Sequence, residues 1–166
     1  MSVADELLKA NETFARNFTL GDLAVRPKRH VAVLACMDSR ILFEHCLGLH
    51  PGDAHMIRNA GGLATDDVIR SLLLSTHLLG TRSIAVIQHT ECGLLSITDE
   101  QFRMRLSAQT GRDASHLDFH SFTDLDRNVE AQVNRILHHP FLPEDIEVRG
   151  YVYDVKSGKL RQTPCS

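Results

Sequence analysis

The stretch His30-Val-Ala-Val-Leu-Ala-Cys36, followed at once by Met37-Asp-Ser-Arg40, decides the fold class of this chain. Its first part is a continuous apolar run with β-branched residues, which is typical of a strand buried on both faces of a sheet. A second run of the same kind, Ser83-Ile-Ala-Val-Ile-Gln-His89, also ends on a side chain that can bind a metal or react. The sequence therefore predicts two buried strands with chemically active residues at their ends.

The segments around these two runs alternate between helix and strand. The spacing of apolar residues predicts helices at about 3–18, 41–49, 65–79, 99–109 and 124–138, and further strands at 54–57 and 147–155. Such alternation predicts an α/β fold, a mostly parallel central sheet flanked by helices. We expect the very apolar helix at 65–79 to be covered on more than one side, with its Leu72–Leu79 stripe in the core or at a subunit interface.

Length and charge limit the classes of protein. At 166 residues the chain is expected to form a single α/β domain over residues 1–166, with a helical arm at about 1–28. A net charge of -3 with scattered Lys and Arg argues against nucleic acid and membrane partners and favours small molecules or further copies of the chain. The sequence starts without a leader-like segment and lacks a run of about 18 apolar residues, so we expect a cytoplasmic protein with reduced thiols.

A metal site is predicted where the two buried strands end. In a parallel sheet the carboxyl ends of the strands lie on one side, so Cys36 and His89 are expected to be neighbours. The spacing His-x-x-Cys places Cys92 close to both. Two thiolates and one imidazole suit Zn²⁺ better than iron or cobalt, and three protein ligands leave one coordination position open, as in catalytic zinc sites.

Asp38 and Arg40 are the predicted catalytic pair beside this site. If Arg40 holds Asp38 ionised, the carboxylate can accept a hydrogen bond from a metal-bound water. If the pair breaks, Asp38 can become the fourth ligand and close the site. The alternative is that the two residues form only a structural ion pair.

Three segments together resemble one known family. Cys-x-Asp-Ser-Arg at 36–40, Arg-Asn-Ala-Gly at 58–61 and His-x-x-Cys-Gly at 89–93 are similar to the signature segments of the β-class carbonic anhydrases, over residues of about 28 to 155. The length resembles that of the compact bacterial members. The resemblance implies zinc bound by Cys36, His89 and Cys92, the Asp38–Arg40 dyad, and reversible hydration of carbon dioxide to bicarbonate by metal-bound hydroxide. It also implies a homodimer with sites near the interface, often assembled into a homotetramer.

Glycines in the second and third segments are candidate substrate contacts. Gly61, Gly62 and Gly93 lack a Cβ, so a ligand can approach the backbone closely. The alternative for residues 58–62 is a turn that needs glycine for its conformation alone.

The substrate is left open between two classes. Compact relatives of the carbonic anhydrases include enzymes that hydrolyse carbonyl sulfide or carbon disulfide at the same zinc centre. The chain has no Trp, so an aromatic pocket wall would come from Phe43, Phe102, Phe119, Phe122, Tyr151 or a partner subunit.

Two other classes of function also remain. One is a catalytically silent zinc protein closed by Asp38, and the other is a redox or cysteine-nucleophile protein that uses Cys36 and Cys92. We expect Cys46 and Cys165 to be structural or incidental. The candidates for a proton shuttle are His45, His50, His55, His77, His138 and His139.

Overall fold

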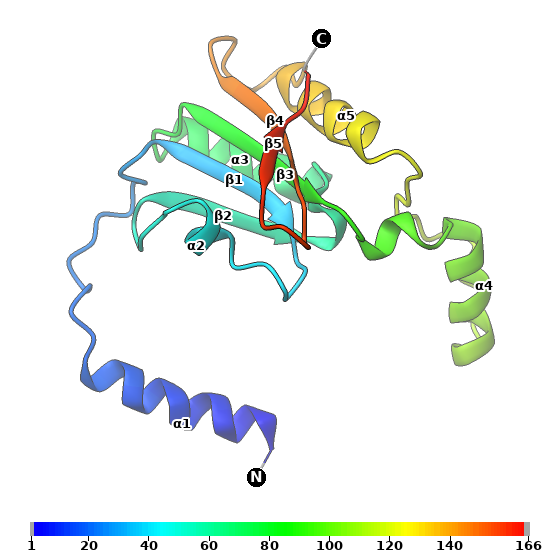
Figure 1. Cartoon of the computed structure of the whole chain (residues 1–166), viewed down its shortest axis with the longest axis horizontal. Coiled ribbons are helices and arrows are strands. Elements are labelled where there is room, and N and C mark those ends of the chain that lie inside the picture. Colours follow the sequence, from blue (N-terminus) through cyan, green and yellow to red (C-terminus); the bar gives the residue numbers. More distant parts are fainter. Residues whose placement is uncertain (1, 165–166) are drawn as a thin grey trace.

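The core of the molecule is a five-stranded sheet, seen in a computed structural model that describes residues 2–164 (Figure 1). Its strands are β1 (Val31–Cys36), β2 (Ala54–Asn59), β3 (Ser83–His89), β4 (Glu147–Tyr153) and β5 (Leu160–Gln162), in the order β2-β1-β3-β4-β5. The first four strands are parallel, and β5 pairs antiparallel with β4. The predicted α/β fold with a mostly parallel sheet is confirmed.

Strand β5 was not predicted. All three of its residues are exposed, so the segment lacks the apolar pattern of a buried strand. Its place is decided by hydrogen bonding to the free edge of β4, a long-range contact that local sequence does not report.

The helices are α1 (Val3–Arg16), α2 (Phe43–Cys46), α3 (Asp66–His77), α4 (Asp99–Thr110) and α5 (Leu125–Leu137). Two single turns of 3-10 helix, η1 (Ala60–Gly62) and η2 (Gly93–Leu95), follow β2 and the loop after β3. The predicted helix at 41–49 was too long, because only residues 43–46 are α-helical.

The helices enclose two apolar layers, one on each face of the sheet. Side chains from α3 and α5 pack with Ala32 and Leu34 on one face. The segment around α2 packs with Val33 and Ala35 on the other, and Phe43 is fully buried there. Because successive side chains of β1 point to opposite faces, this strand is buried on both sides and its end is rigidly placed.

Helix α3 is partly buried against the sheet. Leu72 is fully buried, but Leu74 and Leu78 are 44% and 63% exposed, so in the single chain the helix is covered on one side only. Thr65 occupies the position before the helix, although its side chain makes no capping hydrogen bond.

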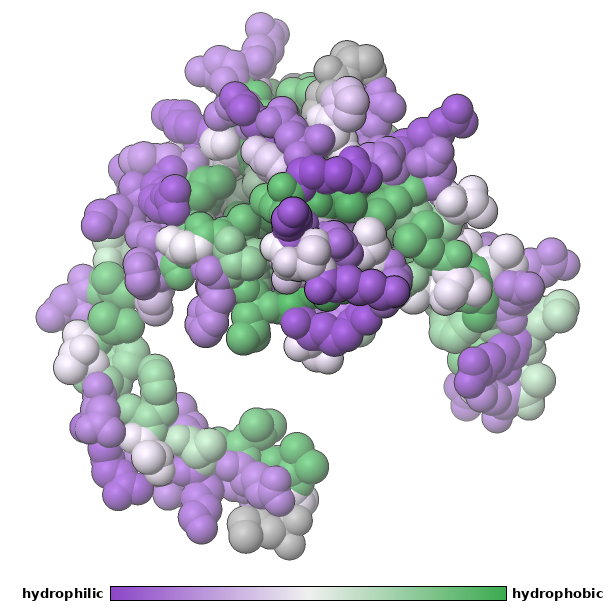
Figure 2. Space-filling view, in the orientation of Figure 1, coloured by the Kyte–Doolittle hydropathy of each residue, from purple (hydrophilic) through white to green (hydrophobic). Residues whose placement is uncertain are grey.

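Helix α1 lies apart from the sheet (Figure 1), and none of its residues is buried. It begins with a complete capping box between Ser2 and Asp5. Apolar side chains remain exposed along it and along the connection that follows (Figure 2): Val3, Leu7, Leu8, Phe14, Phe18, Leu20, Leu23 and Val25. Among the helices of residues 2–164, none has the length and apolar character needed to cross a membrane.

Candidate metal centre

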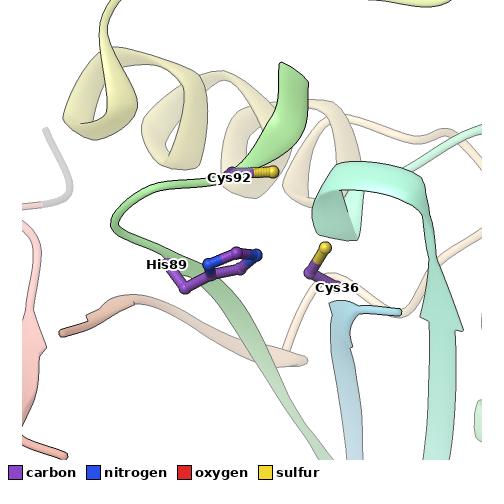
Figure 3. Close-up of side chains that lie close together, drawn as sticks. All are labelled: Cys36, His89 and Cys92. Carbon is purple, nitrogen blue, oxygen red and sulfur yellow. The ribbon is translucent and has the colours of Figure 1, made fainter. Parts of the chain in front are cut away.

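The ends of the neighbouring strands β1 and β3 bring three ligand-type side chains together. Cys36 is the last residue of β1, His89 is the last residue of β3, and Cys92 follows after one short loop. Their ligand atoms all lie within 4.8 Å of one another, and the three residues are buried. Figure 3 shows the side chains converging on a common space from separate segments.

The state of the His89 ring fits a metal ligand. Its Nδ1 is 2.8 Å from the carbonyl oxygen of Thr90, so a neutral ring donates its proton there and leaves a lone pair on Nε2. Nε2 is buried and, within the described residues, has no hydrogen-bond partner. A buried polar atom without a partner is costly, and a cation in the space between His89 and the two sulfurs would satisfy it.

The two thiols fit the same ion. The pKa of Cys36 is lowered because the Cys92 thiol donates a hydrogen bond to its sulfur, with further donation from the backbone N–H groups of Asp38 and Gly61. The pKa of Cys92 is raised because it lies beside the Cys36 sulfur and is buried. The pair therefore shares one proton, and a divalent cation would replace it and hold both residues as thiolates.

Asp38 faces this donor set but is held by Arg40. The guanidinium contacts the carboxylate at Nε–Oδ1 3.0 Å and Nη2–Oδ2 2.7 Å, and the Arg40 backbone N–H donates to Oδ1 at 2.9 Å. These hydrogen bonds lower the pKa of Asp38 to about 2. Asp38 Oδ2 lies 3.7 Å from His89 Nε2, yet Asp38 is outside the clustered set of ligand atoms. The geometry is that of three ligands with an adjacent, ionised carboxylate.

The segment Arg58–Gly62 frames the site from β2. Asn59 closes its own turn, since its side chain donates to the Leu63 carbonyl at 2.8 Å and accepts from the Leu63 N–H at 2.9 Å. At Gly62 a Cβ would lie 3.0 Å from both the Cys36 nitrogen and the Ile87 oxygen. Glycine is therefore required there for packing of the turn against β1 and β3.

A depression of about 790 Å³ opens over the donor set. Gly61 and Gly93 line it, whereas Gly62 lies beneath, against the backbone. Its apolar wall includes Leu94, Ile97 and Phe102, and Arg105 stands among the lining residues. Leu94, Ile97 and Arg105 were not predicted from the sequence, because their positions depend on where η2 and α4 lie relative to the sheet.

Of the aromatic residues considered from sequence, Phe102 lines the depression. The Phe119 ring packs edge-on against the Phe102 ring, with the ring centroids 4.5 Å apart. Phe43 lies in the core on the α2 side of the sheet, where Tyr151 also packs.

The six candidate shuttle histidines lie elsewhere. His45 and His50 line a separate depression of about 740 Å³ beside α2, and His55 is hydrogen-bonded to Ser75 at 2.7 Å. His77 and His138 bond to backbone carbonyls, and His139 accepts from the Phe141 N–H. Cys46 is exposed and outside the donor set, and Cys165 lies outside the described residues.

The comparisons with known proteins agree with this geometry. Residues 31–160 match the family profile described as carbonic anhydrase. The β-carbonic anhydrase 1 of Mycobacterium tuberculosis is 41% identical over 162 residues, which cover 98% of each chain. A crystal structure of carbonic anhydrase from Streptococcus mutans superposes with a TM-score of 0.95, at 41% identity and 99% coverage of both chains.

A relative with another activity is also similar. The carbon disulfide hydrolase of Acidianus sp. is 35% identical over 181 residues, which cover 95% of this chain and 87% of the relative. The profile match and the full-length identity to carbonic anhydrases nevertheless define the family. This chain belongs to the β-carbonic anhydrase family.

Proposed function

We propose that this protein catalyses the reversible hydration of carbon dioxide to bicarbonate with a zinc ion held by Cys36, His89 and Cys92. The observation that carries the proposal is the buried three-residue donor set beside the Asp38–Arg40 pair. Its relatives in M. tuberculosis and S. mutans, matched over nearly their full length, are carbonic anhydrases and support the same activity.

The donor set supports zinc over other metals. Two thiolates and an imidazole are the ligand types that zinc accepts in a tetrahedral arrangement, and three of them leave one position for water or substrate. When bound, zinc supplies Lewis acidity that makes water a nucleophile near neutral pH.

The side chains around the donor set orient the reactants. Arg40 keeps Asp38 ionised, so its free lone pairs can accept a hydrogen bond from the reacting water and fix its direction. Leu94, Ile97 and Phe102 offer an apolar wall to an uncharged linear molecule such as carbon dioxide. Gly61 and Gly93 let that molecule approach the backbone closely.

Hydrolysis of carbon disulfide or carbonyl sulfide is the second candidate. These molecules are linear and carry an electrophilic central carbon, as carbon dioxide does, so the donor set suits all three. The similarity to the carbon disulfide hydrolase of Acidianus sp. is the specific observation in its favour.

One zinc-loaded preparation tests both candidates. Carbon dioxide hydration and sulfide release from carbonyl sulfide and carbon disulfide are measured side by side, and we expect hydration to dominate. Efficient sulfide release with negligible hydration would favour the second candidate.

The Cys92→Ala variant tests the role of the metal. Loss of one of three ligands is expected to abolish both zinc content and turnover. Turnover retained without metal would overturn the mechanism and support a cysteine nucleophile instead. Zinc-loaded wild-type protein with none of the three activities would support a silent zinc protein.

We also propose that the chain is one α/β domain with an N-terminal arm, and that it works as a homodimer or homotetramer in the cytoplasm. The exposed apolar side chains of α1 support assembly, because an isolated helix of this length gains stability mainly by burying such a face. Cys36, Cys46 and Cys92 are not joined in disulfides, which supports a reducing compartment.

A further inference from the structure

Arg58 uses its guanidinium in a way that the proposed reaction does not explain. Nε donates to the carbonyl oxygen of Cys36 at 2.9 Å, and Nη2 donates to the carbonyl oxygen of Asp38 at 2.7 Å. Both partners are backbone carbonyls, and they belong to the residues that carry the thiolate and the carboxylate of the centre. Arg58 itself is not among the residues that line the depression over the donor set.

The backbone that Arg58 holds is otherwise weakly anchored. Strand β1 ends at Cys36, and residues 37–42 form no helix or strand. The pairing with β2 continues for one further bond, from the Met37 N–H to the Asn59 carbonyl at 2.8 Å. Beyond it, the Asp38 carbonyl accepts from the Ile41 N–H at 3.2 Å and from Arg58. The guanidinium is thus a long-range anchor for the Cys36–Met37 and Asp38–Ser39 peptide groups, which flank the Met37–Asp38 peptide group.

The guanidinium is itself held by the core. Its Cζ lies 5.1 Å from the centre of the Phe43 ring, a cation–π distance. Phe43 is fully buried and packs edge-on against Tyr153, with ring centroids 6.1 Å apart. Because the planar guanidinium has fixed donor directions, a rigid ring beneath it also fixes the two carbonyls that it contacts.

The hydrogen bonds of Arg58 also affect the positions of the Cys36 sulfur and the Asp38 carboxylate. The backbone N–H of Asp38, which lies beside the Cys36 sulfur and lowers the pKa of that thiol, belongs to the peptide group between the two whose carbonyls Arg58 holds. The same loop places the Asp38 carboxylate 3.7 Å from His89 Nε2. A loop released from Arg58 would let the thiolate and the carboxylate move relative to His89, which is attached to β3.

We propose that Arg58 is a positioning residue for the metal centre, a two-donor clamp on the backbone of Cys36 and Asp38. The clamp slows loss of the metal through Cys36 and keeps Asp38 in place for turnover. The second part rests on the proposed function, whereas the first requires only that the donor set binds zinc.

The test compares wild-type protein with Arg58→Met, Arg58→Lys and the control Arg149→Met. Arg149 also lies in a parallel strand, but among the described residues its guanidinium pairs with Glu147 alone, at the surface and at 2.6 Å. The readouts are the rate of zinc release to excess chelator, kcat and KM for carbon dioxide, and the thermal midpoint of the zinc-loaded protein.

We expect Arg58→Met to release zinc at least about 10-fold faster than wild type and to lower kcat by about 10- to 100-fold, the usual range for residues that orient metal ligands. KM should stay within about twofold, because Arg58 does not line the depression. The zinc-release rate and kcat of Arg58→Lys should lie between those of wild type and Arg58→Met. The lysine ammonium keeps the charge but lacks the planar two-donor geometry. Arg149→Met should match wild type.

A merely structural role predicts different results. Unchanged zinc release and kcat in Arg58→Met would overturn the proposal, and so would losses that Arg149→Met shares. If Arg58→Met does not fold, Arg58→Lys provides the test. Wild-type values for its zinc-release rate and kcat would overturn the proposal, whereas faster zinc release with a lower kcat would support it.

A double-mutant cycle with Asp38→Asn separates the clamp from general destabilisation. If Arg58 acts on turnover through Asp38, Arg58→Met lowers kcat much less in the Asp38→Asn background than in wild type, while zinc release is still accelerated through Cys36. Fully additive effects on kcat would contradict the proposal. A wild-type protein that holds zinc without hydrating carbon dioxide would refute the proposed function, and zinc release would still test Arg58.

Discussion

Asp38 is held on both oxygens by Arg40, and Arg40 also approaches Glu91, with Nη1–Oε2 at 3.5 Å. The two carboxylates differ in placement, because Asp38 faces His89 whereas Glu91 also pairs with Lys156 at 2.8 Å near the surface. At the scale of single residues, Asp38 is therefore the carboxylate that faces the donor set, whereas Glu91 forms ion pairs near the surface.

Asp38→Asn is expected to keep zinc and to lower kcat by about 100-fold or more, because the amide is neutral and presents one acceptor oxygen in place of two. Glu91→Gln is the matched control and should change kcat less than about twofold. Zinc content and carbon dioxide hydration of the two variants check this. An unchanged rate in Asp38→Asn would remove Asp38 from the mechanism.

Gly62 is the residue where sterics most directly limit the metal centre. It has φ +63°, and a Cβ would meet the backbone of Cys36 and Ile87 at 3.0 Å. Gly111 has a similar φ of +68°, but a Cβ there would meet nothing within 4 Å. Alanine substitutions at the two glycines therefore distinguish the free-energy cost of the backbone conformation from the cost of steric crowding.

Gly111→Ala should lower the free energy of unfolding by about 1 kcal/mol, the conformational cost alone. Gly62→Ala should lower it by about 3 kcal/mol, since crowding of the backbone adds to that cost, and it should also reduce zinc content. Urea unfolding of both variants at one protein concentration is the measurement. Equal losses at the two positions would show that Gly62 has room for a side chain.

At the scale of elements, α4 is joined to the loop before α5 through one carboxylate. Asp99, the first residue of α4, accepts hydrogen bonds from the backbone N–H groups of Phe119, His120 and Ser121 at 2.7, 3.2 and 2.8 Å. Hydrogen bonds from the Ser121 hydroxyl and from the N–H groups of Ser121 and Phe119 hold the pKa of Asp99 well below its usual range. The loop thereby places Phe119 against Phe102 in the wall of the depression.

Asp99→Asn should lower the free energy of unfolding by about 2 kcal/mol at pH 7, because charge-assisted hydrogen bonds are lost. A carboxylate with a depressed folded pKa stabilises the fold above its unfolded pKa of about 4, and this contribution fades as the pH falls through the folded value. The difference between wild type and Asp99→Asn should therefore shrink between pH 5 and the acid limit, measured by urea unfolding at a series of pH values. A difference that stays constant down to about pH 2 would contradict the role of the charge. Asp22→Asn, at an exposed turn, should change stability by less than about 0.5 kcal/mol.

At the scale of the whole molecule, helix α1 of the arm buries none of its residues in the single chain. Leu7 and Phe14 are exposed by 68% and 62% on one side of the helix, whereas Lys9 and Arg16 lie on the opposite side. In the proposed homodimer or homotetramer, a second copy of the chain would cover this apolar side of α1.

The double variant Leu7→Ser with Phe14→Ser should dissociate more readily than wild type, because it removes two large apolar contacts. Lys9→Ser with Arg16→Ser is the control and should assemble as wild type does. Sedimentation velocity over a range of protein concentrations distinguishes the variants. Identical assembly of the double variant and wild type would exclude α1 from the interface.

Much of the fold could be predicted because its strongest signals are local. The strands β1 and β3 were predicted from their continuous apolar runs. Helix α4, predicted at 99–109, begins with a Thr98–Gln101 capping box, which is also a local signal. Edge strand β5 and the length of α2 were missed, because exposed or short segments depend on neighbours that local sequence does not encode.

The sequence by itself determined the chemistry that is available: two cysteines and a histidine at strand ends, an Asp–Arg pair two residues apart, and glycines where the backbone must approach closely. Only the tertiary structure decided which of these groups meet. The parallel register of β1 with β2 sets Ala35 beside Arg58, so a guanidinium reaches carbonyls 20 and 22 positions earlier in the chain. Hydrogen-bond partners of this kind are chosen by strand pairing and by the packing of Phe43, and these are properties of the assembled sheet rather than of any segment of sequence.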